Sequence, residues 1–312
     1  MRTLYVMDPL EKLHIEGDST YVMMRDSTAR GWPVAWCTPD DLSVRDNTAV
    51  ARCQVVTTHD DAPHFRTEET REEPLSAFDA IWMRKDPPFD IDYIFSTYIL
   101  AMAGPKTLVL NDPRSIAASN EKMYALQWPD LSPPTRVTNK VTDVLAFAKE
   151  HGRIVIKPWD GNGGRGVLVT ADGDPNLRSM AELLTAEGGA YCIAQRYLPE
   201  IKTGDKRIVL IDGEPRGWFQ RVPQPGDHRG NMHVGATVEG FEMSDRDREI
   251  CEKIGPRLKA EGLVFVGIDV IGDHMTEINV TSPTGLREIA TLQGRQLGPE
   301  ILDATHRRWK AL

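Results

Sequence analysis

The stretch that decides the fold is Leu263–Val280, which reads LVFVGIDVIGDHMTEINV. Polar and apolar residues alternate along Gly267–Ile271 and again along Met275–Val280. This period of two is typical of β-strands, because successive side chains of a strand point to opposite faces. Gly272–His274, between the two halves, contains turn-forming residues. The stretch is therefore predicted to be a β-hairpin.

The register of this hairpin decides where its polar side chains point. With a three-residue turn, Gly272–His274, Asp269 lies directly opposite Glu277, and both share one face of the hairpin with Asn279. A two-residue turn would instead put Asp269 on the face opposite to that of Glu277. Two facing carboxylates repel each other unless a cation lies between them. Carboxylate and amide oxygens suit Mg²⁺. We therefore predict a metal site at Asp269, Glu277 and Asn279; the alternative is a solvated sheet face.

A glycine-rich loop, Gly161–Gly166 (GNGGRG), lies upstream of the hairpin. Its spacing matches G-x-G-x-x-G, but the dinucleotide-binding form of that motif needs a helix to follow, and Val167–Thr170 has the composition of a strand. A glycine loop between two strands instead resembles the flap that kinases place over ATP phosphates. Lys157 ends the preceding strand, Arg153–Lys157, beside this loop. We predict a phosphate site here; the alternatives are an ordinary hairpin turn and an exposed strand-terminal lysine.

Predicted strands and helices alternate along the first 120 residues, as in an open α/β sheet. This part has predicted strands at 3–7, 34–37, 77–83 and 107–110 and predicted helices at 19–30 and 93–103, whereas residues 40–74 are polar and weakly patterned. The rest has predicted helices at 121–127, 142–150, 177–187 and 245–260, strands at 153–157, 167–170 and 191–197, a hairpin at 208–222 and a mostly helical end.

Charge and composition exclude several classes of protein. The chain has 37 basic and 46 acidic residues, a net charge of −9, and such a surface repels nucleic acid and anionic membrane. No apolar stretch approaches the roughly 18 residues that cross a bilayer, and we see no secretory signal. The four cysteines lack zinc-site spacing, so reduced, buried thiols are expected. We expect a cytoplasmic protein that binds neither nucleic acid nor membrane.

Basic residues stand at predicted strand ends and in loops, where an anionic substrate would need them. Any one of them is more often an ordinary surface charge. Their joint placement around a predicted nucleotide and metal site favours binding of an anion. The residues are Arg84, Lys85, Lys206, Arg207, Arg221 and Arg229.

Five sequence blocks resemble bacterial glutathione synthetase, an ATP-grasp ligase. The likeness runs in order from about residue 6 to residue 303 and is weak at about 40–74. It implies an ATP-grasp fold, α+β in its ATP-binding part, with an N-terminal open α/β domain at 1–120, a central lid domain at 121–200 and a C-terminal domain at 201–312. The blocks are Arg84–Asp90, Asn120–Lys122, Lys157–Gly164, Gly204–Arg207 and Thr276–Pro283.

The resemblance implies a ligase that joins γ-glutamylcysteine and glycine to form glutathione. ATP would be cleaved to ADP and phosphate through an acylphosphate intermediate. The alternative is another ATP-grasp carboxylate–amine ligase with a different amine acceptor. A non-catalytic nucleotide-binding protein is disfavoured because Lys157, Arg207, Asp269, Glu277 and Asn279 occur together. A dinucleotide-dependent oxidoreductase is disfavoured by the strand after the glycine loop.

The resemblance also assigns roles to residues. Two Mg²⁺ ions, or Mn²⁺ in their place, would lie at Asp269, Glu277 and Asn279, and the family suggests a homotetramer. ATP would be bound by Lys122, Lys157, Gly161, Gly163, Gly164, Gly166, Gln195, Tyr197, Leu198 and Asp205. Catalysis would use Lys157, Arg207 and Arg221, and the dipeptide would be bound by Arg84, Arg221, Asn231 and Ser282. Loops 161–166 and 223–240 would close over the site.

Two places depart from the family pattern. The family more often has small residues and paired glycines where this chain has Met232–Ala236, and Gly285 is a milder variation beside the expected dipeptide site. His233 is expected to be an exposed loop residue. If it faced the site instead, the amine acceptor could differ from glycine.

Overall fold

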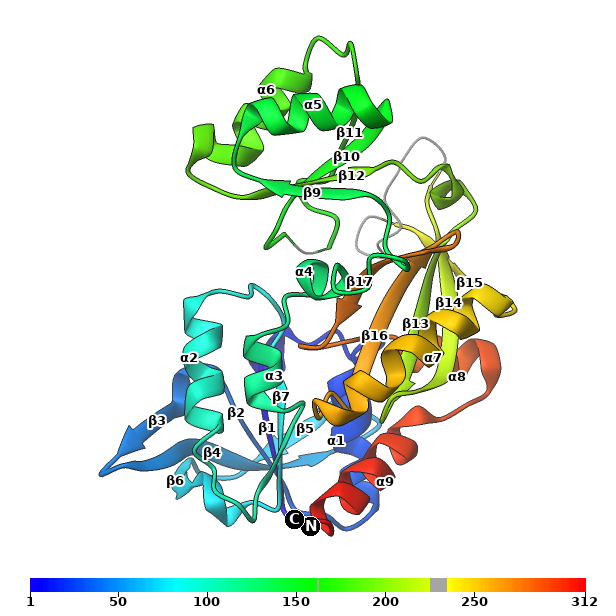
Figure 1. Ribbon diagram of the computed structural model, residues 1–312. Helices are drawn as coiled ribbons and strands as arrows, with labels where there is room; N and C mark the ends of the chain where they lie inside the picture. Colours follow the sequence, from blue (N-terminus) through cyan, green and yellow to red (C-terminus); the bar gives the residue numbers. More distant parts are fainter. Residues whose placement is uncertain (162, 225–234) are drawn as a thin grey trace.

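The computed structural model describes residues 1–161, 163–224 and 235–312. Within these residues the strands form an N-terminal sheet, a central sheet and a C-terminal sheet, of eight, four and five strands. Figure 1 shows the central sheet and its helices as an upper lobe above the other two sheets. The predicted α/β architecture is confirmed.

The N-terminal sheet is parallel at its centre. β1 (Thr3–Met7) pairs in parallel with β2 (Val34–Cys37) and with β7 (Ala80–Arg84), and β8 (Leu108–Leu110) pairs in parallel with β7. Every residue of β1 and β7 is buried, which explains why these strands are almost continuously apolar. The helices of this part are α1 (Ser19–Ala29), α2 (Ile91–Leu100) and α3 (Pro113–Ala117).

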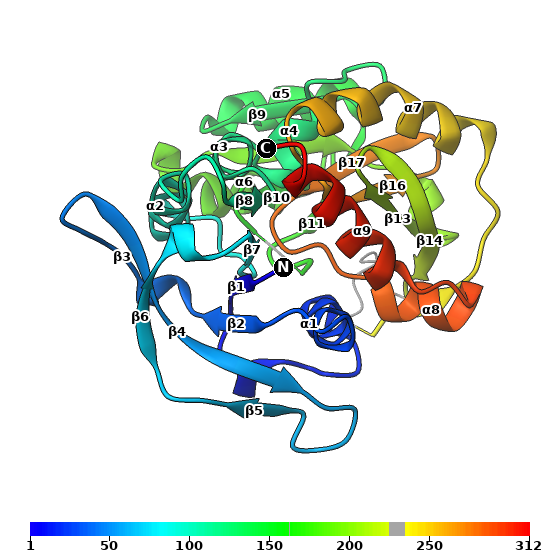
Figure 2. The ribbon, with the colours of Figure 1, turned by 90° about the horizontal axis from the view of Figure 1, so that it is seen from below.

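The polar segment 40–74 forms four antiparallel strands that the sequence did not predict. These are β3 (Leu42–Arg45), β4 (Thr48–Thr58), β5 (Phe65–Thr67) and β6 (Arg71–Pro74). β4 pairs with β2, β3, β5 and β6, and Figure 2 shows this group along one side of the molecule, away from α7 and β14. The three shorter strands are mostly exposed, so little apolar patterning marks them, and pairing with β4 holds them in place.

The central sheet has a hydrophobic core of its own. Its strand order is β11 (Leu168–Ala171), β10 (Arg153–Pro158), β12 (Cys192–Arg196), β9 (Thr135–Thr138). Helices α5 (Val141–His151) and α6 (Leu177–Thr185) pack on one face, where Ile154 and Ile156 of β10 are buried. The alternate residues of β10, Val155 and Lys157, point to the other face. That second face is turned toward the candidate site.

The C-terminal sheet lies between two layers of helices. Its order is β15 (Thr237–Glu239), β14 (Glu214–Val222), β13 (Asp205–Ile211), β16 (Phe265–Ile271), β17 (His274–Asn279). α7 (Asp245–Ala260) packs on the face that carries Ile208 and Ile268. α8 (Leu286–Gln293) and α9 (Leu297–Trp309) pack on the face that carries Val209 and Phe219. Both cores continue into the N-terminal sheet, so these two sheets form one body.

The shorter elements connect these layers. α4 (Glu121–Ala125) contacts β17 and follows the N-terminal sheet. Among the described residues no helix is long and apolar enough to span a bilayer. All four cysteines are free and buried, as predicted. The 3-10 helices are η1 (Leu10–Lys12), η2 (Pro39–Asp41), η3 (Leu75–Ala77), η4 (Ala186–Gly188) and η5 (Pro199–Lys202).

Candidate active site

The hairpin of β16 and β17 has a two-residue turn. Ile271 pairs with His274, so only Gly272 and Asp273 lie between the strands. The three-residue turn assumed in the metal-site prediction is therefore wrong. Gly272 adopts a positive φ of 57°, a conformation that glycine reaches at little cost and that tight hairpin turns require.

A β-bulge restores the register that the two-residue turn would have lost. The pairing shifts between Asp269 and Val270, which leaves Thr276 as an extra residue in β17. The Thr276 hydroxyl donates a hydrogen bond to the Asp269 carbonyl over 3.2 Å. Asp269 consequently pairs with Glu277, and Asn279 donates to the Asp269 carboxylate over 3.2 Å. The three predicted ligands thus share one face of the sheet, as the sequence argument expected.

Two arginines and two aspartates form a buried network on this face. Arg207 donates to both carboxylate oxygens of Asp269, over 2.6 and 3.1 Å, and Arg221 lies 2.9 Å from Asp269 and 2.5 Å from Asp205. Burial alone would raise the pKa of Asp269, but Arg207 and Arg221 lower it to about 2. Burial raises the pKa of Asp205 to about 7; the negative charge of Asp269 adds to this rise, and the positive charges of Arg221 and Arg207 offset it only in part. Both arginines are nearly inaccessible to solvent.

Two buried lysines meet the carboxylate of Glu277 from different elements. Lys157 Nζ, on β10, lies 3.4 Å from Glu277 Oε1, and Lys122 Nζ, on α4, lies 3.8 Å from the same atom. Lys122 also binds Glu121 and donates to the carbonyl of Gly161 over 2.6 Å. Burial alone would lower the pKa of Lys122, but the carboxylates of Glu277 and Glu121 raise it. Lys122 therefore remains charged beside the glycine loop.

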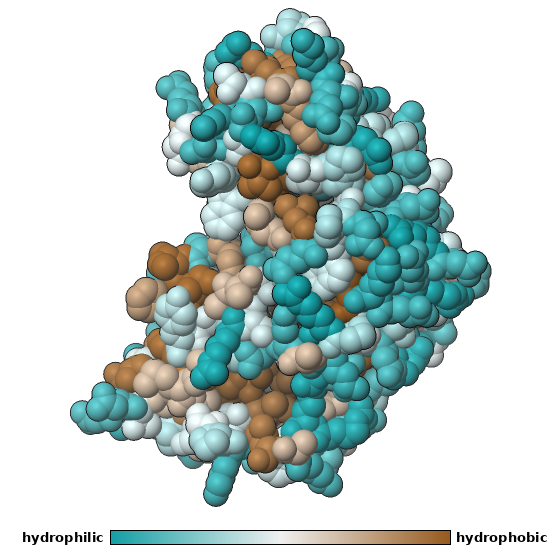
Figure 3. Space-filling view, viewed as in Figure 1, coloured by the Kyte–Doolittle hydropathy of each residue, from teal (hydrophilic) through white to brown (hydrophobic). Residues whose placement is uncertain are grey.

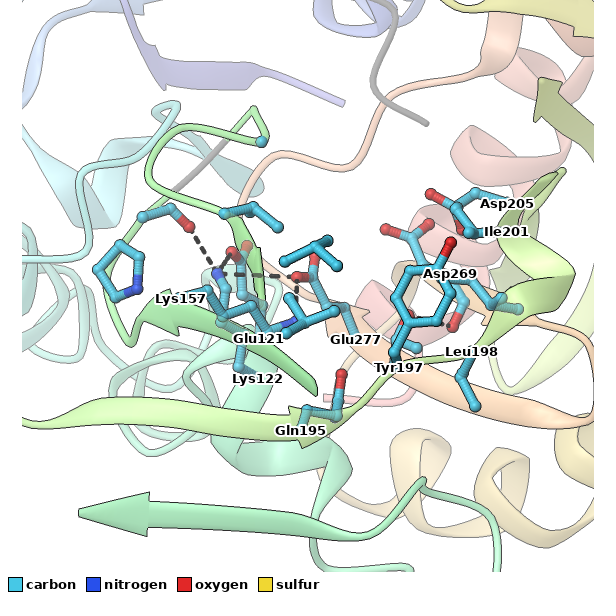
Figure 4. Close-up of a pocket in the computed structure, with 18 of the residues that line it drawn as sticks. Glu121, Lys122, Lys157, Gln195, Tyr197, Leu198, Ile201, Asp205, Asp269 and Glu277 are labelled. Carbon is cyan, nitrogen blue, oxygen red and sulfur yellow. Dashed lines mark hydrogen bonds and ion pairs between the residues drawn. The ribbon is translucent and has the colours of Figure 1, made fainter. Parts of the chain in front are cut away.

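These residues line a pocket between the central and C-terminal sheets. It encloses about 890 Å³, counting its open mouth, which is the size of a small-molecule site. Figure 4 shows Lys122, Lys157 and Glu277 together on one side and Tyr197 and Leu198 on the other. The predicted residues that line it are Lys122, Lys157, Gly161, Gly163, Gly164, Gln195, Tyr197, Leu198, Asp205, Asp269 and Glu277.

The glycine loop uses conformations that other residues avoid. Gly163, Gly164 and Gly166 have φ values of 61°, 77° and 72°, in the left-handed region that favours glycine. A Cβ at Gly161 would lie 2.6 Å from Cγ of Pro158. The loop leads into strand β11 and not into a helix, which confirms the argument against a dinucleotide-binding turn.

Several predicted residues do not line the pocket. Gly166 packs against Pro158, whereas Arg207, Arg221 and Asn279 lie beside Asp269 on the same sheet face. Asn231, with Arg229 and His233, falls in residues 225–234, outside the described part of the chain. The roles assigned to all of these residues stay predictions.

Arg84 joins the N-terminal sheet to the loop that follows β17. It is buried at the end of β7, donates to the Thr20 hydroxyl over 3.1 Å and to the Pro283 carbonyl over 2.9 Å, and lies over the ring of Phe265. Ser282 is half-buried in the same loop. The structure therefore brings Arg84 and Ser282 to one place, although their predicted contact with the dipeptide stays a prediction.

Sequence reasoning missed part of the pocket wall. Val155 and Val169 lie opposite each other on β10 and β11 and face the pocket. They could have been found from the alternation of β10, since Val155 shares a face with Lys157. No local signal marks the others, which come from separate elements. The missed lining residues are Glu121, Val155, Pro158, Val167, Val169, Ile201, Ile271 and Thr276.

The donor set at Asp269, Glu277 and Asn279 fits a hard cation. It consists of oxygen ligands on one face, and the low pKa of Asp269 keeps that carboxylate ionised. The described residues contain no cluster of three or more His, Cys, Asp or Glu side chains arranged for a metal; this set has two carboxylates and one amide. Asp269 already forms a short ion pair with Arg207, whereas the lysine contacts of Glu277 are longer, at 3.4 and 3.8 Å. The carboxylate of Glu277 is therefore more available to a metal ion.

Comparison with protein-family models gives matches along nearly the whole chain. Residues 1–117 match the N-terminal domain of prokaryotic glutathione synthetase, and residues 121–294 match its ATP-grasp domain. Relatives named glutathione synthetase include that of Brucella melitensis, 45% identical over 97% of both chains, and that of Gloeobacter violaceus, 46% identical over 97% of this chain and 96% of the relative.

Solved structures share the fold at low sequence identity. D-cycloserine synthetase DcsG has a TM-score of 0.67 at 15% identity and covers 98% of this chain and 99% of its own. An ATP-grasp RimK domain protein from Sphaerobacter thermophilus has a TM-score of 0.63 at 17% identity, with coverage of 97% and 99%. At such identities the likeness shows the fold alone, and that fold is ATP-grasp.

Proposed function

The chain belongs to the prokaryotic glutathione synthetase family, and from this membership we propose how its residues carry out the reaction. It is an ATP-dependent carboxylate–amine ligase that makes glutathione from γ-glutamylcysteine and glycine. The observation that carries the residue assignment is the meeting of Lys122 and Lys157 with Glu277 in one pocket. Two lysines and a carboxylate that can bind a metal ion, close together in one pocket, suit the binding of a nucleoside triphosphate.

ATP lies in this pocket, with its base toward the apolar wall. Val155, Val169, Leu198 and Ile201 supply that wall, and the backbone of Gln195–Leu198 can hydrogen-bond the adenine edge. Asp205, at the same end of the pocket (Figure 4), would accept a hydrogen bond from the ribose. The support for this orientation is the separation of apolar and charged residues between the two ends.

The phosphates lie at the charged end of the pocket. Lys122 and Lys157 provide positive charge, and the backbone N–H groups of Gly161, Gly163 and Gly164 can approach the phosphates closely because these positions lack side chains. Asp269, Glu277 and Asn279 would hold Mg²⁺, as two ions or replaced by Mn²⁺. When bound, the metal neutralises phosphate charge and orients the γ-phosphate.

The reaction divides into two transfers. The cysteinyl carboxylate of γ-glutamylcysteine attacks the γ-phosphorus, the bond to ADP breaks, and an acylphosphate forms. The neutral amine of glycine then attacks the acyl carbon, loses a proton and expels phosphate. Arg207 and Arg221 lie on the sheet face beside Asp269, where their charge would stabilise the developing oxyanion. Arg84, Ser282 and Asn231 are assigned to the dipeptide.

Closure over the pocket keeps water from the acylphosphate. Gly161, Gly163, Gly164 and Arg165 line the pocket, and Lys122 donates a hydrogen bond to the carbonyl of Gly161. A loop that closes only with substrates present would limit hydrolysis of the intermediate. Loop 223–240 is assigned the same role, although residues 225–234 lie outside the described part of the chain.

We also propose that the chain forms a homo-oligomer, a tetramer by family analogy. The support is a stripe of exposed apolar residues formed by α2 and the turn after it; in Figure 3, brown patches among polar atoms lie on the same side of the molecule as α2 in Figure 1. Ile91, Phe95, Tyr98 and Met102 are each about half exposed or more, at 64%, 59%, 57% and 47%. Their spacing of four, three and four residues gives one continuous helix face. Because ATP is a substrate, we propose a cytoplasmic location.

The decisive experiment measures phosphate release from ATP and Mg²⁺ with γ-glutamylcysteine, in the presence and absence of glycine. Release that depends on glycine, with a product of the mass of glutathione, supports the proposal. If phosphate release depends on the dipeptide but other amines support it as well as glycine does, the ligase chemistry stands with a different acceptor. No release under any of these conditions contradicts the residue assignment.

A further inference from the structure

The face of the C-terminal sheet that carries the site has an apolar half and a charged half. Asp205, Arg207 and Val209 share one face of β13, and their cross-strand neighbours are Arg221, Phe219 and Gly217. α8 covers the half without charges, because a Cβ at Gly217 would lie 2.6 Å from Ile289. The start of α8 borders the charged half, because Gly285 lies against Phe219, the cross-strand neighbour of Arg207.

The chain enters α8 by a tight approach to this face. Gly285 has a φ of 124°, and a Cβ there would lie 2.7 Å from the ring of Phe219. The backbone N–H of Leu286 donates to the Ser19 hydroxyl over 3.3 Å, and Arg207 donates to the carbonyl of Thr284 over 3.2 Å. The start of α8 is thus fixed against the N-terminal part of the chain and against the site arginine.

Glu288, in this first turn, carries an oxygen that nothing in the described structure satisfies. Its Oε2 atom is buried and has no hydrogen-bond partner among residues 1–161, 163–224 and 235–312. Burial raises the pKa of Glu288, and its own backbone N–H and the charges of Arg207, Arg287 and Arg221 offset this only in part. None of these arginines forms a described ion pair with it.

A buried carboxylate oxygen without a partner costs stability. Glu288 lies within the electrostatic reach of Arg207 and Arg221, yet Arg207 is committed to Asp269, and Arg221 to Asp205 and Asp269. The carboxylate of Glu288 therefore lies at the border of the positively charged pair Arg207 and Arg221. A zwitterionic amino acid has the matching pattern, with a carboxylate for the arginines and an ammonium group for the glutamate.

We infer that Glu288 binds the ammonium group of an amino-acid substrate in this site. The inference rests on the proposed function and deepens it by assigning a residue to substrate recognition. Two ammonium groups have this chemistry: the α-ammonium of the γ-glutamyl donor and the ammonium of the glycine acceptor. A hydrogen bond between charged groups in a buried site contributes roughly a tenfold to hundredfold change in binding.

The test uses the full-length enzyme with ATP and Mg²⁺, and the variants Glu288→Gln and Glu288→Ala. Glu252→Gln, an exposed carboxylate on α7, is the matched control. Glu288→Gln keeps the shape and removes the charge, so KM for one amino-acid substrate should rise about tenfold to a hundredfold. KM for ATP should stay within about twofold of the wild-type value, since Glu288 does not line the nucleotide pocket.

A substrate without the amino group identifies the donor. Glutarylcysteine is γ-glutamylcysteine with the α-amino group replaced by hydrogen. If Glu288 binds the donor ammonium, the wild-type enzyme should discriminate against glutarylcysteine at least tenfold, and Glu288→Gln should discriminate far less. If Glu288 binds the acceptor, both enzymes should discriminate equally, and KM for glycine should rise in the variant instead. Either result supports the inference.

Binding measurements separate this inference from the proposed function. Calorimetric titration of γ-glutamylcysteine and of glycine into the wild type and the variants requires no turnover. If the wild type turns over and Glu288→Gln and Glu288→Ala bind both substrates within twofold of it, the inference is wrong while the function stands. If the wild type does not turn over but the variants lose affinity for one substrate, the inference stands and the reaction assignment is wrong.

Discussion

Lys157 and Glu277 are 120 residues apart in sequence, and their side chains meet at 3.4 Å. Lys157 belongs to the central sheet and Glu277 to the C-terminal sheet. The central sheet has a hydrophobic core of its own, and this ion pair is one of the polar contacts that join it to the C-terminal sheet. The same two charges are assigned to the phosphates and the metal, so the substrate would replace this ion pair when it binds.

Replacing Glu277 should abolish Mg²⁺-dependent turnover and leave the fold intact. Glu277→Ala or Glu277→Gln removes the carboxylate of the donor set that is most available to a metal ion. The expected loss of kcat is about 100-fold or more, as for other groups that stabilise developing charge. Steady-state kinetics at several Mg²⁺ concentrations measure this, with Glu182→Gln as the control, because Glu182 is a half-exposed carboxylate on α6, away from the pocket. Activity near the wild-type level would remove Glu277 from the metal site.

Replacing Arg207 should lower turnover more than nucleotide affinity. Arg207→Ala removes a guanidinium beside Asp269 but none of the residues that line the pocket. We expect kcat to fall about 100-fold with KM for ATP changed by less than about threefold. The variant should also be less stable, because a buried Asp269 loses its bidentate partner. An effect confined to KM for ATP would contradict the proposed role.

The carboxyl of Asp205 should make stability depend on pH. Burial raises its pKa from 3.8 to about 7 in the folded protein, so the folded state holds a proton that the unfolded state loses. The wild type should therefore lose stability relative to Asp205→Asn as the pH rises from about 4 to 7, and the difference should level off above 7. Urea unfolding of both proteins across this range measures it. If the wild type instead gained stability relative to Asp205→Asn as the pH rises, the raised pKa of Asp205 would be refuted.

Substrates should protect the glycine loop from proteolysis. Arg165 is exposed and lines the pocket, so trypsin can reach it when the site is open. Cleavage after Arg165 should slow several-fold when ATP, Mg²⁺ and γ-glutamylcysteine are present, whereas cleavage after the exposed Arg178 should be unchanged. Mass spectrometry of the fragments distinguishes the two cuts. Equal rates at Arg165 with and without substrates would argue against closure.

The apolar stripe on α2 should mediate self-association. Phe95→Glu places a charge at the centre of the stripe and should shift the sedimentation coefficient toward a smaller species without reducing stability, since Phe95 is 59% exposed. Tyr191→Glu, which alters a single aromatic residue of similar exposure (58%) in the loop before β12, is the control. An unchanged assembly in Phe95→Glu would place the interface elsewhere.

Much of the site could be predicted because its residues carry local signals. The alternation of polar and apolar residues placed Asp269 and Glu277 on strands, and the strand after Gly166 excluded a dinucleotide turn. The strands at 40–74 escaped prediction because their exposed residues are polar and their stability comes from pairing with β4. The apolar wall of the pocket escaped because it comes from several elements at once.

The amino-acid sequence by itself determined several residues that could do the chemistry. These are Lys157 beside a glycine loop, and two carboxylates and an amide that alternate with apolar residues as in a strand. Only the tertiary structure decided their register and their partners. The turn at Gly272–Asp273 would have separated Asp269 from Glu277, and the bulge at Thr276 brings them together. The orphaned oxygen of Glu288 likewise has no local signature. Periodicity is a property of neighbouring residues, whereas register and burial depend on contacts between segments distant in the chain.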